Sequence, residues 1–239
     1  MMNRRAAELG MTHTHFINAC GLDEPGHYSS ARDVALMSRE LLKHKDVLKY
    51  TNIWMDSLRG GATQLVNTNK LLKSYSGITG LKTGTTGQAG RCISATAERE
   101  GMGLVAVVLG GVTSEERFTA AMEMLDYGFA NYEAVAFPPV AGAATSLPVA
   151  LGAEKEVALV YHTPEKVLAK KGSGASLCAT LTLPQKLSAP VQSGVEVGAV
   201  TLKSGETVIA SYPIVTAKSV DKMDFNTGIK LLFDALTAL

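Results

Sequence analysis

Cysteine is scarce in this sequence, and its spacing excludes most of the roles that cysteine has in small domains. The 239 residues contain three cysteines, Cys20, Cys92 and Cys178, and no two of them form a CxxC pair. We therefore expect no zinc site. An odd number allows one disulfide at most. The simpler interpretation, which we favour, is free and buried cysteine.

A strong charge and a long apolar run are also absent. The formal net charge is +1, so we expect no general attraction to nucleic acid or to an anionic membrane. No apolar run reaches the roughly eighteen residues of a membrane-spanning helix, so none is predicted. Hydrophobic residues make up 46% of the chain. That share fills a sizeable core, over one or two domains of roughly 150 residues.

The start of the chain has the pattern of two helices. Residues 2–9 predict a helix that ends at Gly10, because glycine is favoured just after a helix C-terminus. Residues 31–44 predict a second helix with an apolar face. Ser30 and Asp33 form a plausible capping box at its start.

The middle of the first half has the pattern of strands. Residues 53–58 and 63–66 flank Arg59-Gly60-Gly61-Ala62, which is typical of a hairpin. Residues 91–97 and 104–109 predict two further strands joined by a short turn. Consecutive strands in this region predict an antiparallel sheet.

A third helix is predicted to follow this sheet and to pack across it. Thr113 and Glu116 form a second capping box at its start. The helix presents four apolar residues on one face: Phe118, Met122, Leu125 and Phe129. A helix lying on a core has this spacing. The first part of the chain is therefore predicted to be α+β, an antiparallel sheet with helices.

The composition changes after residue 136. Residues 137–144 are rich in proline, glycine and alanine and predict a linker. Short strand-like runs separated by Gly, Pro and Ser then occur at 156–161, 177–183, 195–202 and 207–215. They predict a small β-sandwich over residues 145–218. Residues 219–239 are predicted to form a C-terminal amphipathic helix.

The sharpest chemical signal is the triplet Lys82-Thr83-Gly84, which follows a strand-like stretch. At a strand edge, the Lys82 ammonium would stabilise a substrate carboxylate and the charge that develops at a nucleophile. Thr83 offers a hydroxyl to the same carboxylate, and Gly84 has no Cβ to keep a substrate backbone away. Alone, such a triplet is more often an ordinary surface lysine beside a turn. It is also one of three elements shared by β-lactamases and penicillin-binding proteins.

Further stretches make the chain resemble the low-molecular-mass D-alanyl-D-alanine carboxypeptidases, which are serine-type penicillin-binding proteins. The stretches that carry the resemblance are, in order, Met2–Met11, Phe16–Asn18 with Gly21–Asp23, His27–Asp33, Thr68–Leu72, Gly77–Gly84, Val107–Gly111 and Arg117–Phe118. Their order and spacing are far more specific than the triplet alone. Thr79 is a departure, because the family often has an aspartate there. The resemblance implies an incomplete transpeptidase-like domain over residues 1–136.

The resemblance also implies the site residues. Lys82, Thr83 and Gly84 would be catalytic, and the backbone N–H of Thr85 would be one donor of the oxyanion hole. Arg117 would hold the terminal carboxylate of D-alanyl-D-alanine, because a guanidinium forks onto a carboxylate. The alternative for Arg117 is a solvated charge in the first turn of a helix. A cation there opposes the helix dipole, which favours a functional purpose. No metal or cofactor is implied.

The catalytic serine is expected to be missing. In the family, the nucleophilic serine, its partner lysine and the Ser-x-Asn element precede the position that Met2 matches. Ser-x-x-Lys occurs here at Ser219-Val220-Asp221-Lys222, which we interpret as a solvated linker, and Ser-x-Asn does not occur. Tyr50-Thr51-Asn52 imitates the related Tyr-x-Asn element by coincidence. Without a nucleophile, acyl transfer has no covalent route, so the chain alone is predicted to be inactive.

The implied function is that of a D-alanyl-D-alanine carboxypeptidase of peptidoglycan maturation, in the cell envelope at the outer face of the cytoplasmic membrane. Its partners would be stem peptides ending in D-Ala-D-Ala and, once the missing segment is present, β-lactam inhibitors. An inactive fragment or homologue that binds peptidoglycan or a protein partner is the alternative. A β-lactamase relative fits Lys82 but does not account for the sandwich after Pro139.

Two expectations concern surfaces. The C-terminal helix either lies on the membrane surface or packs against its own domain or a second copy. Residues 225–239 contain one lysine, Lys230, whereas a membrane-seeking helix is rich in lysine and arginine on its polar face. An incomplete sheet leaves an open strand edge, which favours a homodimer.

Overall fold

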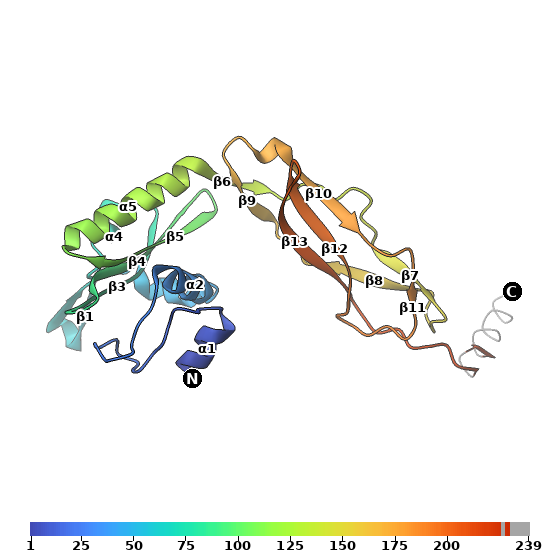
Figure 1. Cartoon of the computed structure of the whole chain (residues 1–239), viewed down its shortest axis with the longest axis horizontal. Coiled ribbons are helices and arrows are strands. Elements are labelled where there is room, and N and C mark those ends of the chain that lie inside the picture. The colour runs from blue at the N-terminus through green and yellow to red at the C-terminus, as the bar shows by residue number, and fades with distance from the viewer. Residues whose placement is uncertain (226–227, 230–239) are drawn as a thin grey trace. The chain divides into compact units, whose positions relative to one another are not determined.

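The chain forms two compact units in a computed structural model that describes residues 1–225, 228 and 229 (Figure 1). The first unit runs from Met1 to Glu133, and the second begins at Ala134. The domain limits predicted above stay a prediction. Most of the predicted helix over residues 219–239 lies outside the described residues.

The core of the first unit is a three-stranded antiparallel sheet with a helix on either side. Its order is β3-β4-β5, with β3 over Ile78–Thr86, β4 over Gly90–Arg99 and β5 over Met102–Gly111. Helix α5 (Ser114–Asn131) lies on one face, and α2 (Ala31–Leu41) lies on the other (Figure 1). The predicted antiparallel sheet and its covering helix are confirmed.

Helix α5 begins as predicted. The Thr113 hydroxyl accepts from the Glu116 N–H at 3.1 Å, and the Glu116 carboxylate accepts from the Thr113 N–H at 3.2 Å, so the capping box is complete. Phe118, Leu125 and Phe129 are buried. Their spacing puts them on one face, which packs against β4 and β5.

Helix α2 begins at the predicted cap, but the second half of its capping box is wrong. The Ser30 hydroxyl accepts from the Asp33 N–H. The Asp33 carboxylate does not accept from the Ser30 N–H, as a capping box requires; it accepts from the His13 N–H at 2.8 Å and the Thr14 hydroxyl at 2.7 Å. Asp33 is 1% exposed. Its side chain therefore fixes the loop before the helix, and this use of the carboxylate depends on residues about twenty positions away.

Helix α1 (Met2–Glu8) ends in the predicted way. Gly10 has φ +72°, the Gly10 N–H donates to the Ala7 carbonyl, and the Met11 N–H donates to the Ala6 carbonyl. These two bonds form a Schellman motif, which needs a residue that tolerates positive φ.

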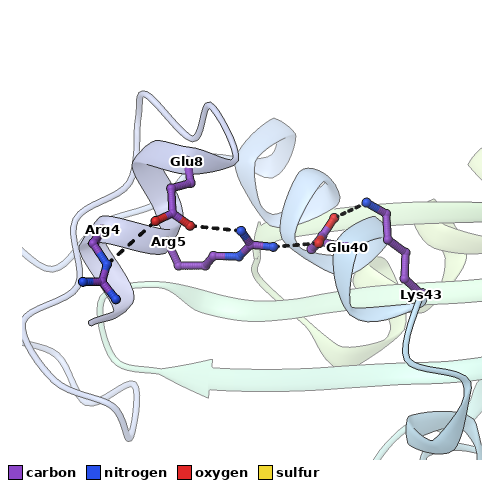
Figure 2. Close-up of polar contacts among 5 residues, drawn as sticks. All are labelled: Arg4, Arg5, Glu8, Glu40 and Lys43. Carbon is purple, nitrogen blue, oxygen red and sulfur yellow. Dashed lines mark hydrogen bonds and ion pairs between the residues drawn. The ribbon is translucent and has the colours of Figure 1, made fainter. Parts of the chain in front are cut away.

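Ion pairs connect α1 to α2 across the surface of the first unit (Figure 2). Arg5 lies 3.0 Å from Glu8 on its own helix and 2.7 Å from Glu40 on α2. Lys43 lies 2.6 Å from the other oxygen of Glu40. Because exposed pairs are screened by solvent, this network orients α1 more than it stabilises the unit.

A hairpin and two short helices precede β3. Strand β1 (Met55–Leu58) pairs antiparallel with β2 (Thr63–Val66), as predicted. Helix α3 (Leu48–Thr51) comes before this hairpin, and α4 (Leu71–Ser74) comes after it. Both helices contact β3, so they flank the strand that carries Lys82.

The described part of the second unit consists mainly of strands. A six-stranded sheet has the order β10-β12-β13-β8-β7-β11, and β6 pairs with β9. The bounds are β6 Tyr132–Ala136, β7 Ser146–Ala150, β8 Glu156–Tyr161, β9 Lys166–Lys170, β10 Leu177–Thr182, β11 Leu187–Ser188, β12 Glu196–Ser204 and β13 Thr207–Thr216. The four predicted strands are β8, β10, β12 and β13, and all four are confirmed. The others were not predicted.

Two stretches predicted to be linkers contribute to the core of the second unit. Val220 is 1% exposed and lies in a core cluster with Val149, Val157 and Val191. Residues 219–222 are therefore not a linker, although Ser219, Asp221 and Lys222 are exposed as expected. Within residues 137–144, Phe137 and Val140 pack against a second cluster that is built on Ala179, Val200 and Ile214.

The cysteines are free, as predicted, but the expectation that they are buried is wrong. Cys20 and Cys178 are exposed, and Cys92 is partly exposed. Within the part of the chain that is described, no helix is long and apolar enough to cross a membrane.

Candidate functional site

Strand β3 presents the Lys82-Thr83-Gly84 triplet at the edge of its sheet. In the described part of the chain β4 is its one neighbour in the sheet, so no strand pairs with its other edge there. Such an edge accepts an extended peptide as an additional strand. A Cβ placed on Gly84 would meet no atom within 4 Å. The packing of the described residues therefore does not require glycine at this position, and the space beside it is open.

The path of β3 before the triplet depends on a different glycine. Gly80 has φ +144°, and a Cβ there would lie 2.7 Å from the Thr51 side chain. The Thr51 hydroxyl donates to the Thr79 carbonyl at 2.9 Å. Thr51 therefore packs against β3, while Tyr50 is 73% exposed.

Lys82 projects from β3 and is exposed. Its ammonium donates to the Thr83 carbonyl at 2.5 Å. Among the described residues, Lys82 forms no ion pair with a carboxylate. Its charge is therefore available to an anion beside the strand.

Arg117 reaches β3 from the first turn of α5. Its Nη1 donates to the Gly84 carbonyl at 3.2 Å, to the Thr85 hydroxyl at 3.3 Å and to the Cys92 carbonyl on β4 at 3.2 Å. Arg117 is 6% exposed. The alternative that it is a solvated charge is therefore wrong.

The buried charge of Arg117 has no counterion in the described residues. No carboxylate pairs with it there, and its Nε is buried without a hydrogen-bond partner. Burial, and then repulsion from the Arg91 guanidinium, lower the pKa of Arg117 below its usual value. A buried cation without a counterion is costly, so this geometry is complementary to an anionic ligand.

Thr83 has a partner that was not predicted. Its Oγ1 lies 2.5 Å from the Thr68 Oγ1, and Thr83 is 8% exposed. Thr68 lies in the stretch Thr68–Leu72, which contributes to the family resemblance. The family resemblance of this stretch was the one indication in the sequence that Thr68 matters. It could not predict a contact between two hydroxyls fifteen positions apart.

The predicted site residues therefore come together in the first unit. Lys82, Thr83, Gly84 and Thr85 are consecutive on β3, and Arg117 contacts the last two. The arrangement places two cations and two hydroxyls beside a strand edge that no other described strand covers. Within the described residues, no group of three His, Cys, Asp or Glu side chains is placed to hold a metal ion.

Comparison with known families matches both units. Residues 1–113 match the family model described as D-alanyl-D-alanine carboxypeptidase. Residues 140–222 match the model described as penicillin-binding protein 5, C-terminal domain.

Individual relatives agree with these matches. The chain is 38% identical over 233 residues to D-alanyl-D-alanine carboxypeptidase DacF of Bacillus subtilis, covering 96% of this chain and 60% of the relative. It is 33% identical to DacC of Escherichia coli, covering 94% of this chain and 56% of the relative. The chain thus spans under two thirds of the length of these relatives.

A solved structure gives the same result. Penicillin-binding protein 5 from Haemophilus influenzae is similar with a TM-score of 0.78 at 28% identity, covering 92% of this chain and 65% of that one. The resemblance inferred from the sequence is confirmed. Over the matched residues of both units, the chain belongs to the D-alanyl-D-alanine carboxypeptidase family of penicillin-binding proteins.

Proposed function

We propose that this chain provides the carboxylate-binding side of a serine-type D-alanyl-D-alanine carboxypeptidase, which acts on peptidoglycan stem peptides in the cell envelope. The observation that carries the proposal is Arg117, a buried guanidinium with no counterion in the described residues, held against the strand of Lys82 and Thr83. A terminal carboxylate supplies the missing negative charge.

Each residue has a role in this proposal. The peptide lies along the open edge of β3, beside Gly84, where no side chain intervenes. Arg117 and the Thr83 hydroxyl bind the terminal carboxylate, because charge-assisted hydrogen bonds are the stronger kind. The Lys82 ammonium stabilises the charge at the reacting centre, and the Thr85 N–H serves as an oxyanion-hole donor.

The covalent step needs a nucleophile with its base. The Ser-x-x-Lys at Ser219 is part of the second unit, where Val220 between the two residues is buried in the core. We propose that this serine does not react and that the chain by itself is not acylated. Labelled penicillin should leave this chain unlabelled and should label a serine when a Ser-x-x-Lys segment of the family is supplied with it. Labelling of Ser219 would contradict the proposal.

The carboxylate site is tested by peptide binding. Diacetyl-L-lysyl-D-alanyl-D-alanine is titrated into the isotope-labelled chain while the backbone amide signals of residues 82–85 are followed. The same peptide with a C-terminal amide is the matched control. The proposal predicts that the acid binds about tenfold more tightly than the amide, since a hydrogen bond to a charged group contributes roughly 1.5–3 kcal/mol. Equal affinities would reject it.

Two surface roles stay predictions. Contact of the C-terminal helix with a membrane surface concerns residues 219–239, most of which lie outside the described part of the chain. A homodimer through the open sheet is the other. Sedimentation velocity of the chain, with and without lipid vesicles, checks both.

A further inference from the structure

The Thr83 hydroxyl is shared between the proposed substrate site and a second hydroxyl. Thr83 is buried, and its Oγ1 lies 2.5 Å from the Thr68 Oγ1. Thr68 itself is exposed and lies just before α4. The contact therefore joins the substrate strand to a separate element.

The turn that carries Thr68 is held by the two asparagines on either side of it. The Asn67 side-chain oxygen accepts from the Asn69 N–H at 2.9 Å, and its amide donates to the Ile53 carbonyl at 3.0 Å. The Asn69 side-chain oxygen accepts from the Leu71 N–H at 3.2 Å, and both Asn69 and Leu71 are 1% exposed. The backbone of Thr68 is therefore well anchored, although its side chain is at the surface.

The direction of this hydrogen bond decides whether Thr83 presents a proton or lone pairs to the substrate. A hydroxyl has one proton and two lone pairs, and one proton occupies the bond between the two threonines. If Thr83 donates to Thr68, Thr83 faces the substrate with lone pairs, which a carboxylate repels. If Thr68 donates to Thr83, the Thr83 proton is free to point at the carboxylate.

We propose that Thr68 is a positioning residue that makes Thr83 a hydrogen-bond donor toward the terminal carboxylate. The Thr68 hydroxyl donates to Thr83 Oγ1, and Thr83 passes its own proton outward. Thr68 would thereby contribute to the preference for a peptide acid over a peptide amide without touching the peptide. This inference rests on the proposed function.

The test measures that preference in the full chain. Diacetyl-L-lysyl-D-alanyl-D-alanine and its C-terminal amide are titrated into the wild type, Thr68→Val, Thr68→Ser and Thr79→Val. Valine keeps the shape of threonine and removes the hydroxyl. Thr79→Val is the matched control. Thr79 lies on the same strand as Thr83, and its hydroxyl forms the same kind of pair with the Thr96 hydroxyl, at 2.8 Å.

The expected result is selective. Thr68→Val should bind the acid about two- to fourfold more weakly and the amide nearly unchanged, because Thr83 can still donate to the carboxylate but loses the donor that orients and polarises its hydroxyl. Thr68→Ser should restore the wild-type preference, and Thr79→Val should keep it. Thr68→Ala is the second variant if the valine variant does not fold.

Two results would overturn the inference alone. One is a wild type that prefers the acid together with a Thr68→Val variant that retains the preference. The other is an equal loss for acid and amide in that variant, which a purely structural role of Thr68 predicts. A wild type without any preference for the acid overturns the proposed function, and the inference with it.

Discussion

The two units of this chain bury different kinds of side chain. Among the described residues, the buried polar or charged side chains of the first unit are Asp33, Ser38, Asn69, Thr83, Ser94, Thr96 and Arg117, and that of the second unit is Thr216. The second unit otherwise buries aliphatic side chains, in clusters around Val157 and Val200.

The two units therefore use different interactions to specify their folds. Buried polar groups are costly unless they are paired, so each one constrains the positions of its partners. Ser38 and Ser94 bond to each other at 2.7 Å between α2 and β4, and Thr79 and Thr96 bond between β3 and β4. The first unit thus fixes the strand of the proposed site by directional contacts, whereas the second relies on the alternation of apolar residues.

Among changes that distinguish the two units, truncation of a core side chain should have the largest effect on the free energy of unfolding. Leu125 is 1% exposed on α5. Leu125→Ala should lower the free energy of unfolding of the first unit by about 2–5 kcal/mol, because a cavity is left. Ile214→Ala is the matched change in the second unit. Calorimetry should show two transitions, with each variant moving only its own. A shift of both transitions by one substitution would mean that the units unfold together.

The next effect concerns the buried cation. Arg117→Met keeps most of the side-chain length and removes the charge. The peptide acid should then bind about ten- to 100-fold more weakly, since charge-assisted hydrogen bonds contribute roughly 1.5–3 kcal/mol. The amide should be affected much less. Lys203→Met removes the same charge from the second unit and should change neither affinity; if it weakens the acid as strongly, the effect is one of net charge.

Acid should destabilise the first unit through Asp33. Burial alone would raise the pKa of Asp33, but the hydrogen bonds from Thr14 and His13 outweigh it and lower the pKa below its usual value. The stabilisation is therefore present above the unfolded pKa of roughly 3.9 and is lost as the pH falls through the lower folded pKa.

Asp33→Asn tests that pH dependence. Thermal unfolding of the wild type and the variant between pH 7 and pH 2 should converge at the acid end, because the carboxylate is protonated there. The transition of the second unit should be the same in both proteins at every pH. A constant difference across the range would show that the charge of Asp33 does not matter.

The smallest effect is expected at the surface network of the first unit. The Lys43 ammonium, followed by the Arg5 charge, holds the pKa of Glu40 below its usual value in spite of partial desolvation. Glu40→Gln should lower the unfolding temperature of the first unit slightly at low salt, and the difference should vanish in 1 M NaCl, because salt screens exposed charges. A difference that persists at high salt would indicate packing rather than charge.

Local patterns were predictable from the sequence because the interactions behind them span few residues. The Thr113 capping box and the Gly10 helix end involve neighbours within about five positions, and the hairpin around Gly60 pairs residues at most eleven positions apart. The alternation of apolar and polar residues in 177–183 matches the burial of β10, since side chains alternate across a strand.

Contacts between distant residues were not predictable in this way. The Asp33 carboxylate bonds to residues 13 and 14, and the Thr83 hydroxyl bonds to Thr68. The parallel pairing of the short strand β11 with β7 leaves no periodic signal either. Residues 219–222 were interpreted as a linker because they follow the predicted sandwich, yet Val220 completes a core cluster.

By itself, the sequence determined the family, the fold class and the strand that carries Lys82, because these depend on ordered motifs and on local periodicity. The tertiary structure alone decided that Arg117 is buried without a counterion in the described residues and that Thr83 shares its hydroxyl with Thr68. The physical reason is that burial and hydrogen bonding depend on which segments pack together. A charge near a helix start looks the same in the sequence whether it faces water or a substrate strand.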